Sequence, residues 1–141
     1  MMADDGAGIA VLELLAEKKV PGGVDVIDAG TGGMSLLHVL ADFDFVVIAD
    51  AVDMGMRPGT VRSFSPDDVV SVKELRRISL HEGDVFEILI VARRLGQCPD
   101  NVVICAIQPK RVEPGIGLSP PVREGLRRLS SAISDAVALA L

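Results

Sequence analysis

The pattern of apolar and polar positions predicts strands and helices that alternate along the chain. Positions 45–49 hold five apolar residues in a row, three of them β-branched, and predict a strand that is buried on both faces. A second apolar, β-branched run at 101–107 predicts another strand. Shorter strands are expected at 24–28 and 60–64. We expect residues 45–50 to form the central strand of a sheet.

Between these runs, apolar residues recur at the three- and four-residue spacing of amphipathic helices. Clear helices are expected from about residue 85 to Gly96, and from Ser119 as the cap and Pro120 as the first helical position. Two further helices are predicted, one from Asp4 or Asp5 to about residue 20 and one over 34–40. One helical turn is expected over 65–68. The predicted loops are residues 29–33, 69–79 and 108–118. The expected buried stripe of the last helix is Val122, Leu126, Leu129, Ile133 and Val137.

This alternation predicts a single α/β domain over residues 1–141, a three-layer α/β/α sandwich with a mixed, mostly parallel sheet. In open α/β sheets, ligands bind at the carboxyl ends of parallel strands. Asp50 ends the 45–50 run and is therefore a candidate site residue. The neighbouring Asp53 is expected to serve a turn.

Composition excludes several classes of function. A net charge of −6, with no Trp or Tyr, argues against nucleic-acid binding, which requires a basic face. No apolar run approaches the roughly 20 residues of a membrane span, and the first residues do not form a secretory signal, so we expect a cytoplasmic protein. Arg123, Arg127 and Arg128 form a local basic patch, which we interpret as a solvated helix face. Cys105 is expected to be buried.

Three residues are candidates for metal or acid–base chemistry: Asp5, Asp50 and His81. Asp5 also serves as a helix cap in the simplest interpretation. His81 precedes a helix, where the helix dipole favours a neutral imidazole able to bind metal, or it is an exposed loop histidine. Together the three would suit nickel or zinc with open positions for water or substrate. Periodicity alone does not bring them together.

Five segments, in order along the chain, resemble those of the nickel–iron hydrogenase maturation endopeptidases, and together they span nearly the whole sequence. They are Asp4-Asp5-Gly6-Ala7-Gly8-Ile9, Asp28-Ala29-Gly30-Thr31-Gly32-Gly33-Met34, Val46-Val47-Ile48-Ala49-Asp50-Ala51, Ser79-Leu80-His81, and Gln108-Pro109 with Glu113 to Pro120. Residues 80–84 are most similar to the version that serves the deazaflavin-reducing hydrogenase of methanogens. The resemblance implies a phosphorylase/hydrolase-like fold.

The resemblance also implies an aspartic-type peptidase that removes a C-terminal extension from the hydrogenase large-subunit precursor after nickel insertion. In the family, two acids and a histidine contact a metal ion and are associated with recognising the substrate's nickel; the matching positions are Asp5, Asp50 and His81. Nickel would arrive with the substrate, and zinc or cadmium would also suit the site. Many members have Glu at the position of Asp5, which is one methylene longer. Asp50 and Asp5 are the candidate catalytic carboxylates, and a metal-bound hydroxide is the alternative nucleophile.

The resemblance departs from the family at the start of the chain. The family has an apolar strand and a Gly-Asn turn before the Asp4-Asp5-Gly6 segment, and that strand lies inside the sheet between the second and third strands. Neither is present in this sequence. We expect a late start codon rather than a sheet that closes differently. A chain this short is expected to have a gap beside the 45–50 strand and low stability.

Two classes of function follow from the sequence. One is the nickel-dependent endopeptidase, and the other is a nickel-sensing chaperone that binds the hydrogenase precursor without cutting it. No large apolar stripe remains once the core is assigned, so a monomer is expected that meets its partner transiently.

Overall fold

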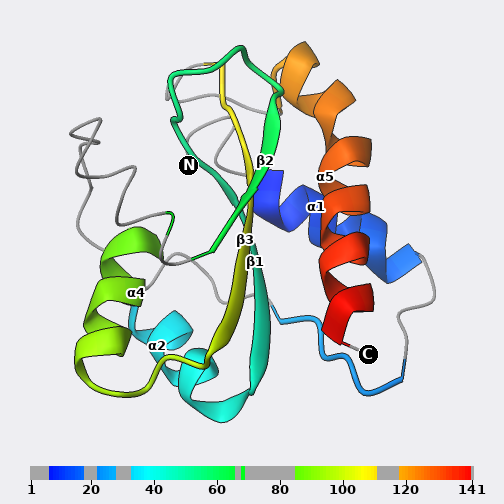
Figure 1. The fold of residues 1–141 in the computed structure, drawn as a ribbon. Coiled ribbons are helices and arrows are strands. Elements are labelled where there is room, and N and C mark those ends of the chain that lie inside the picture. Colours follow the sequence, from blue (N-terminus) through cyan, green and yellow to red (C-terminus); the bar gives the residue numbers. More distant parts are fainter. Residues whose placement is uncertain are drawn as a thin grey trace. The chain divides into compact units, whose positions relative to one another are not determined.

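A computed structural model describes six parts of the chain and seven helices and strands within them (Figure 1). The described residues are 7–17, 22–27, 33–65, 68, 85–110 and 118–140. The elements are α1 (Ala7–Glu17), α2 (Gly33–Asp42), β1 (Phe45–Ala51), β2 (Val61–Phe64), α4 (Val85–Arg94), β3 (Asn101–Ile107) and α5 (Pro120–Ala140). Helices and strands are therefore interspersed along the chain, although α1 and α2 are consecutive helices and β1 and β2 are consecutive strands among the described residues.

Contacts divide the chain into two compact units. The first unit contains residues 1–28, 47–63 and 104–141, and the second contains residues 29–46 and 64–103. The prediction of a single domain over the whole chain stays a prediction, and each unit is described by itself below.

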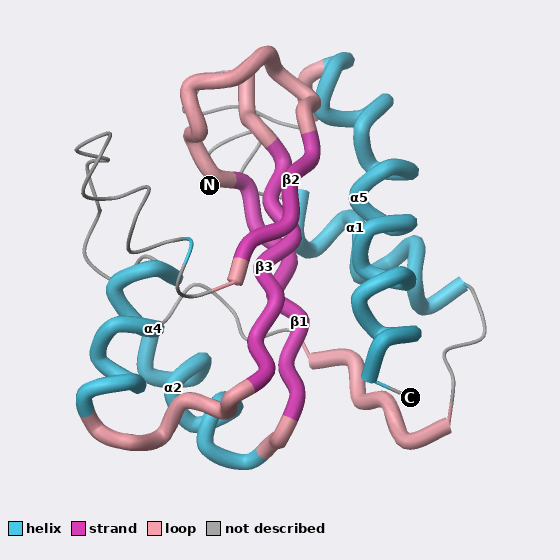
Figure 2. Tube along the Cα trace, in the orientation of Figure 1, coloured by secondary structure: helices cyan, strands magenta, loops and turns pink. Residues whose placement is uncertain are grey.

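The three strands pair in the order β1-β3-β2 (Figure 2). β1 and β3 run in the same direction, because the amide of Val52, just after β1, donates to the carbonyl of Ile107 at the end of β3 (3.0 Å). β2 runs the opposite way, because the amide of Gln108, just after β3, donates to Thr60, just before β2 (2.8 Å). The sheet of the described residues is therefore mixed.

The expectation that the 45–50 run is the central strand, buried on both faces, is wrong for the described residues. β3 lies in the middle of the sheet, and only Val46 among the seven residues of β1 is buried. In β3, five of the seven residues are buried. β1 has one hydrogen-bonded neighbour, β3, so its other edge adds no burial to its side chains.

The predicted strand at 24–28 is also wrong over its described part. Residues 24–27 are irregular, and Val26 and Ile27 are 44% and 42% exposed. A short alternating run becomes a strand only when a neighbour satisfies its backbone groups, and the pattern carries no information about that neighbour.

In the first unit, α1 packs against α5 (Figure 1). The predicted start of α5 is confirmed, because the helix begins at Pro120 and the Arg123 amide donates to the Ser119 carbonyl (2.9 Å). Of the expected stripe, Val122, Leu126, Leu129 and Ile133 are buried, and Val137 is half-buried. No helix among the described residues is long and apolar enough to cross a membrane.

In the second unit, α2 packs against α4, and both supply buried residues to one core (Leu37, Leu40, Leu89 and Ala92). The predicted end of α4 at Gly96 is confirmed. Gly96 has φ +69°, its amide donates to Arg93, and the Gln97 amide donates to Ala92, which together form a Schellman cap. Leu95 is 58% exposed, since it lies in this cap and no longer follows the helical spacing.

The described ends of the predicted helical turn at 65–68, Ser65 and Asp68, form a reciprocal pair of hydrogen bonds. The amide and hydroxyl of Ser65 both donate to the carboxylate of Asp68 (3.1 Å each), and the Asp68 amide donates to the Ser65 hydroxyl (3.4 Å). This pairing is that of a capping box, with Asp in place of the usual Glu.

Candidate active site at the carboxyl end of β1

Asp50 lies at the carboxyl end of β1, where the sequence places it. The side chain is half-buried, and its Oδ1 accepts a hydrogen bond from the Ala51 amide (2.9 Å). Because β1 and β3 run in parallel, the carboxyl end of β3 meets this end of β1. A half-buried carboxylate in this position is able to accept a proton or to bind a divalent cation.

The first turn of α1 lies directly against the end of β1. A Cβ atom at Gly8 would stand 2.9 Å from the carbonyl oxygen of Ala49, which is closer than real Cβ atoms approach backbone. Only glycine therefore allows the helix to approach the strand next to Asp50. The contact places Gly8, which is three positions after Asp5 in the sequence, next to the candidate site. Asp5 itself lies outside the described residues.

Gln108 holds the loop that follows β1. Its side chain is 6% exposed, and Oε1 accepts hydrogen bonds from the amides of Met54 (2.6 Å) and Met56 (3.3 Å). Its Nε2 donates to Oδ1 of Asp53 and to the Pro109 carbonyl, both at 3.1 Å. Both ends of the amide are thus used, and one side chain fixes the backbone just beyond Asp50 to the end of β3.

Asp53 serves the turn that the sequence predicts. Its Oδ1 accepts a hydrogen bond from the Gly55 amide two residues further on (3.1 Å), which is an Asx-turn. This bond, followed by the bond from the Gln108 amide, lowers the pKa of Asp53 below its ordinary value, although partial burial opposes the change. Asp53 is therefore ionised at neutral pH.

Gln108 is the residue whose role the sequence analysis missed. The local pattern predicts a loop there and the family resemblance includes Gln108-Pro109, but neither gives the side chain a role, although a polar residue directly after the buried run at 101–107 is a usable signal. The sequence does not reveal its partners, because they lie on a loop 52 to 55 positions earlier in the chain.

Neither cysteine has the lowered pKa that is typical of an activated thiol. Burial raises the pKa of Cys105, which lies in β3 with no exposed surface and 3.8 Å from the Ser63 hydroxyl. Burial also raises the pKa of Cys98, against the opposing effect of nearby Arg93. Reactive cysteines need a lowered pKa. The expected burial of Cys105 is confirmed.

Of the three candidate metal ligands, the structure places only Asp50. Asp5 and His81 lie outside the described residues, as do residues 4–6, 28–32, 79–84 and 113–117 of the segments that carry the resemblance. Over the part of the chain that is described, no three His, Cys, Asp or Glu side chains gather as a metal site would require. Whether Asp5, Asp50 and His81 meet therefore stays a prediction.

Comparison with known proteins agrees with this architecture. Residues 9–136 match the family model of the hydrogenase maturation proteases. The structure is similar to that of the hydrogenase maturating endopeptidase HybD from Escherichia coli, with a TM-score of 0.83 and 28% identity over 99% of this chain and 86% of that one. The α/β class that the sequence predicts is thereby confirmed.

Curated relatives agree with the family match. The hydrogenase expression/formation protein HupD of Bradyrhizobium diazoefficiens is 35% identical over 88% of this chain, and HupD of Rhodobacter capsulatus is 32% identical over 97%. The chain spans 66% and 65% of these two relatives, which is slightly less than two thirds. The hydrogenase 2 maturation protease of Escherichia coli is 32% identical, and the match covers 86% of this chain and 75% of that protein. The chain belongs to the hydrogenase maturation protease family.

Proposed function

We propose that this protein is an endopeptidase that removes the C-terminal extension of a nickel–iron hydrogenase large-subunit precursor. Cleavage follows nickel insertion, and the nickel in the precursor is recognised by Asp5, Asp50 and His81. Nickel is thus part of the substrate. Two carboxylates and an imidazole suit a borderline divalent ion, so zinc or cadmium would also occupy the site.

The contact between α1 and β1 supports this proposal best. Gly8 lies against Ala49, so the first turn of α1, shortly after Asp5 in the sequence, lies beside the end of β1 that carries Asp50. Such a contact favours a shared site for the two acids, at the sheet edge where α/β folds bind ligands. Gln108 also supports the site, because its hydrogen bonds to the amides of Met54 and Met56 fix the loop that follows Asp50.

The raised pKa values of both thiols also favour a mechanism without a cysteine nucleophile. A carboxylate acting on water is then the simplest hydrolytic group, and Asp50 is the candidate that the described residues offer. A water bound to the substrate's nickel would be easier to deprotonate, which is the alternative route to the nucleophile.

The test is incubation of the protein with nickel-loaded large-subunit precursor, followed by mass spectrometry of the precursor. We expect the precursor to lose the mass of its C-terminal extension. Asp50→Asn removes the charge and keeps the shape, so it should lower the cleavage rate by at least about a hundredfold. Asp44→Asn is the matched control, because Asp44 is exposed just before the amino end of the same strand. It should cleave like the parent protein.

Three outcomes separate the candidate functions. Full cleavage by Asp50→Asn, with an unchanged circular dichroism spectrum, would remove Asp50 from the mechanism. Retention of the nickel-loaded precursor on immobilised protein, without any change of mass, would favour the non-cleaving chaperone. Equal cleavage of nickel-loaded and nickel-free precursor would contradict recognition of the metal.

A further inference from the structure

A wide, shallow depression in the first unit lies between α5 and the segment that leads into β2, and Asp50 is not among the residues that line it. Its volume is about 730 Å³. The lining residues are Arg57, Pro58, Gly59, Thr60, Val61, Arg62, Arg127, Arg128, Ser131, Ala132 and Asp135. Four arginines and one aspartate give this lining a formal charge of +3, whereas the whole chain carries −6. Positive charge is thus concentrated on one small surface of an acidic protein.

Backbone contacts hold the floor of the depression in place. Gly125 of α5 packs against the 57–60 segment so closely that a Cβ there would stand 2.7 Å from the Gly59 carbonyl oxygen. Gly59 has φ +86°, and a Cβ there would clash with the Pro121 carbonyl. Arg128 adds a hydrogen bond from Nη2 to the Gly59 carbonyl (3.0 Å). The two sides of the depression, the 57–62 segment and α5, are therefore held together before any ligand binds.

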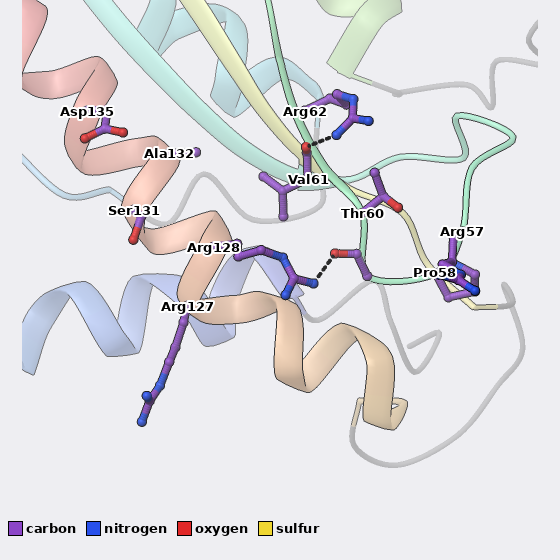
Figure 3. A pocket seen from close by; sticks show the side chains of 11 residues that line it. Arg57, Pro58, Thr60, Val61, Arg62, Arg127, Arg128, Ser131, Ala132 and Asp135 are labelled. Atoms are coloured by element: carbon purple, nitrogen blue, oxygen red, sulfur yellow. Dashed lines mark hydrogen bonds between the residues drawn. The ribbon is translucent and has the colours of Figure 1, made fainter.

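The arginines differ in how they are used (Figure 3). Arg128 points across to Gly59 and is committed to holding the wall, and Arg62 bonds the neighbouring Val61 carbonyl through one nitrogen (2.9 Å). Arg127 projects from α5 in another direction, and Arg57 lies at the far end of the 57–62 segment. All four side chains are exposed. Their guanidinium groups point in different directions and do not converge on one point.

This spacing selects among anionic ligands. A compact anion such as phosphate is held best where several donors converge, as in a bidentate clamp. Spread arginines suit an extended chain with several carboxylates, each meeting a different guanidinium. Nucleic acid is disfavoured because the rest of the protein is acidic and the lining contains no aromatic residue for base stacking.

We infer that this arginine depression, whose lining does not include Asp50, docks an extended acidic segment of the protein that the enzyme cleaves. The identity of the docked protein rests on the proposed function, whereas the preference for an acidic peptide does not. Exposed charges of this kind raise the rate of encounter and fix orientation more than they add affinity. The depression would thus orient the precursor while the C-terminal extension of the precursor reaches Asp50 at the end of β1.

The preference is tested by fluorescence anisotropy with a labelled peptide of alternating glutamate and glycine, and with the matching glutamine–glycine peptide. The acidic peptide should bind, and binding should weaken as salt rises from about 50 to about 300 mM, since exposed charges are screened. Each of Arg57→Gln, Arg62→Gln and Arg127→Gln should weaken binding about twofold to fivefold, and the triple variant at least about tenfold. Arg128 is left intact because it holds Gly59.

The matched control is Arg94→Gln, which removes the same charge from the exposed last turn of α4. It should bind the acidic peptide as the parent does. Equal binding of both peptides, an equal loss in Arg94→Gln, or full binding by a folded triple variant would each overturn the inference. Tighter binding of a short single-stranded oligonucleotide than of the acidic peptide would overturn the peptide assignment. None of these measurements involves cleavage, so failure of the proposed protease function would leave them unaffected.

Discussion

β1 and β3 contain the same tripeptide in two different environments. Both strands have seven residues, and Val-Val-Ile occupies their second to fourth positions, ending at Ile48 in β1 and at Ile104 in β3. Ile104 is fully buried, whereas Ile48 is only half-buried. The side chains are identical, so the difference comes from the position of each strand, since in the sheet of the described residues β3 has a neighbour on both sides and β1 has one.

The two strands also end differently. β3 is followed by Gln108, which is 6% exposed and uses its whole amide to hold the loop beyond β1. β1 has Asp50 as its next-to-last residue, which is half-buried and is the candidate for chemistry. The buried strand therefore supplies the framework, and the less buried strand carries Asp50, the candidate for chemistry. Candidate chemistry lies on the strand with more access to solvent, which a hydrolytic water requires.

The sharpest test of this difference truncates the same side chain in both strands. Ile104→Ala should lower the free energy of unfolding by about 4 kcal/mol, since a fully buried isoleucine leaves a cavity. Ile48→Ala should lower it by about 2 kcal/mol or less, because part of this side chain is already in contact with water. Urea unfolding monitored by circular dichroism gives both values, provided that the dependence on urea is the same in the three proteins.

A smaller change provides the control for this pair. Ile104→Val and Ile48→Val remove one methylene each and keep the β-branch, so the order should be the same with losses of about 1 kcal/mol or less. Equal losses at the two positions in both series would mean that β1 is as buried in solution as β3.

The second test removes the support that β3 gives to the end of β1. Gln108→Leu keeps the volume but leaves the Met54 and Met56 amides without their acceptor, which should cost about 2 kcal/mol of stability. Amide hydrogen exchange at these two residues should become faster by a larger factor than exchange within β3. Gln97→Leu, at an exposed glutamine after α4, is the matched control. Unchanged exchange at Met54 and Met56 in Gln108→Leu would contradict the role of Gln108.

Much of this arrangement could be predicted from the sequence. The run at 101–107 matches β3 in full, and the start of α5 at Pro120 and the end of α4 at Gly96 follow from local chemistry of proline and glycine. Asp50 was placed at a strand end because a polar residue closes an apolar run. These features depend on residues a few positions apart, and the local pattern records them.

What the sequence could not supply depends on residues far apart in the chain. The central position of β3, the irregular path of residues 24–27 and the bonds of Gln108 are all set by neighbours that the local pattern does not name. The arginines illustrate the same limit. Arg127 and Arg128 were interpreted as a solvated helix face, and only the fold places Arg57 and Arg62 on the same depression. Asp5 and His81 lie outside the described residues, so their meeting with Asp50 stays a prediction.

The smallest effect concerns pH and the link between the two strand ends. The pKa of Asp53 is lowered by the Gly55 amide and by Gln108 of the β3 end, so the folded state favours the ionised carboxylate. This contribution is present above the unfolded pKa of about 3.9 and is lost as pH falls through the lower folded value. Because Asp53 is exposed, it amounts to at most about 0.5 kcal/mol after screening.

Asp53→Asn should therefore lose little stability at pH 6. The difference in the free energy of unfolding between variant and parent, called the gap below, should close as the pH falls below about 3.9. The measurement is urea unfolding of both proteins over this range of pH, with Asp44→Asn as the control for removal of an exposed aspartate. In a Gln108→Leu background the gap should shrink, because one of the two bonds that lower the pKa is already gone. A gap of the same size in both backgrounds would mean that the Gly55 amide alone holds Asp53, and that β3 acts on the loop only through Met54 and Met56.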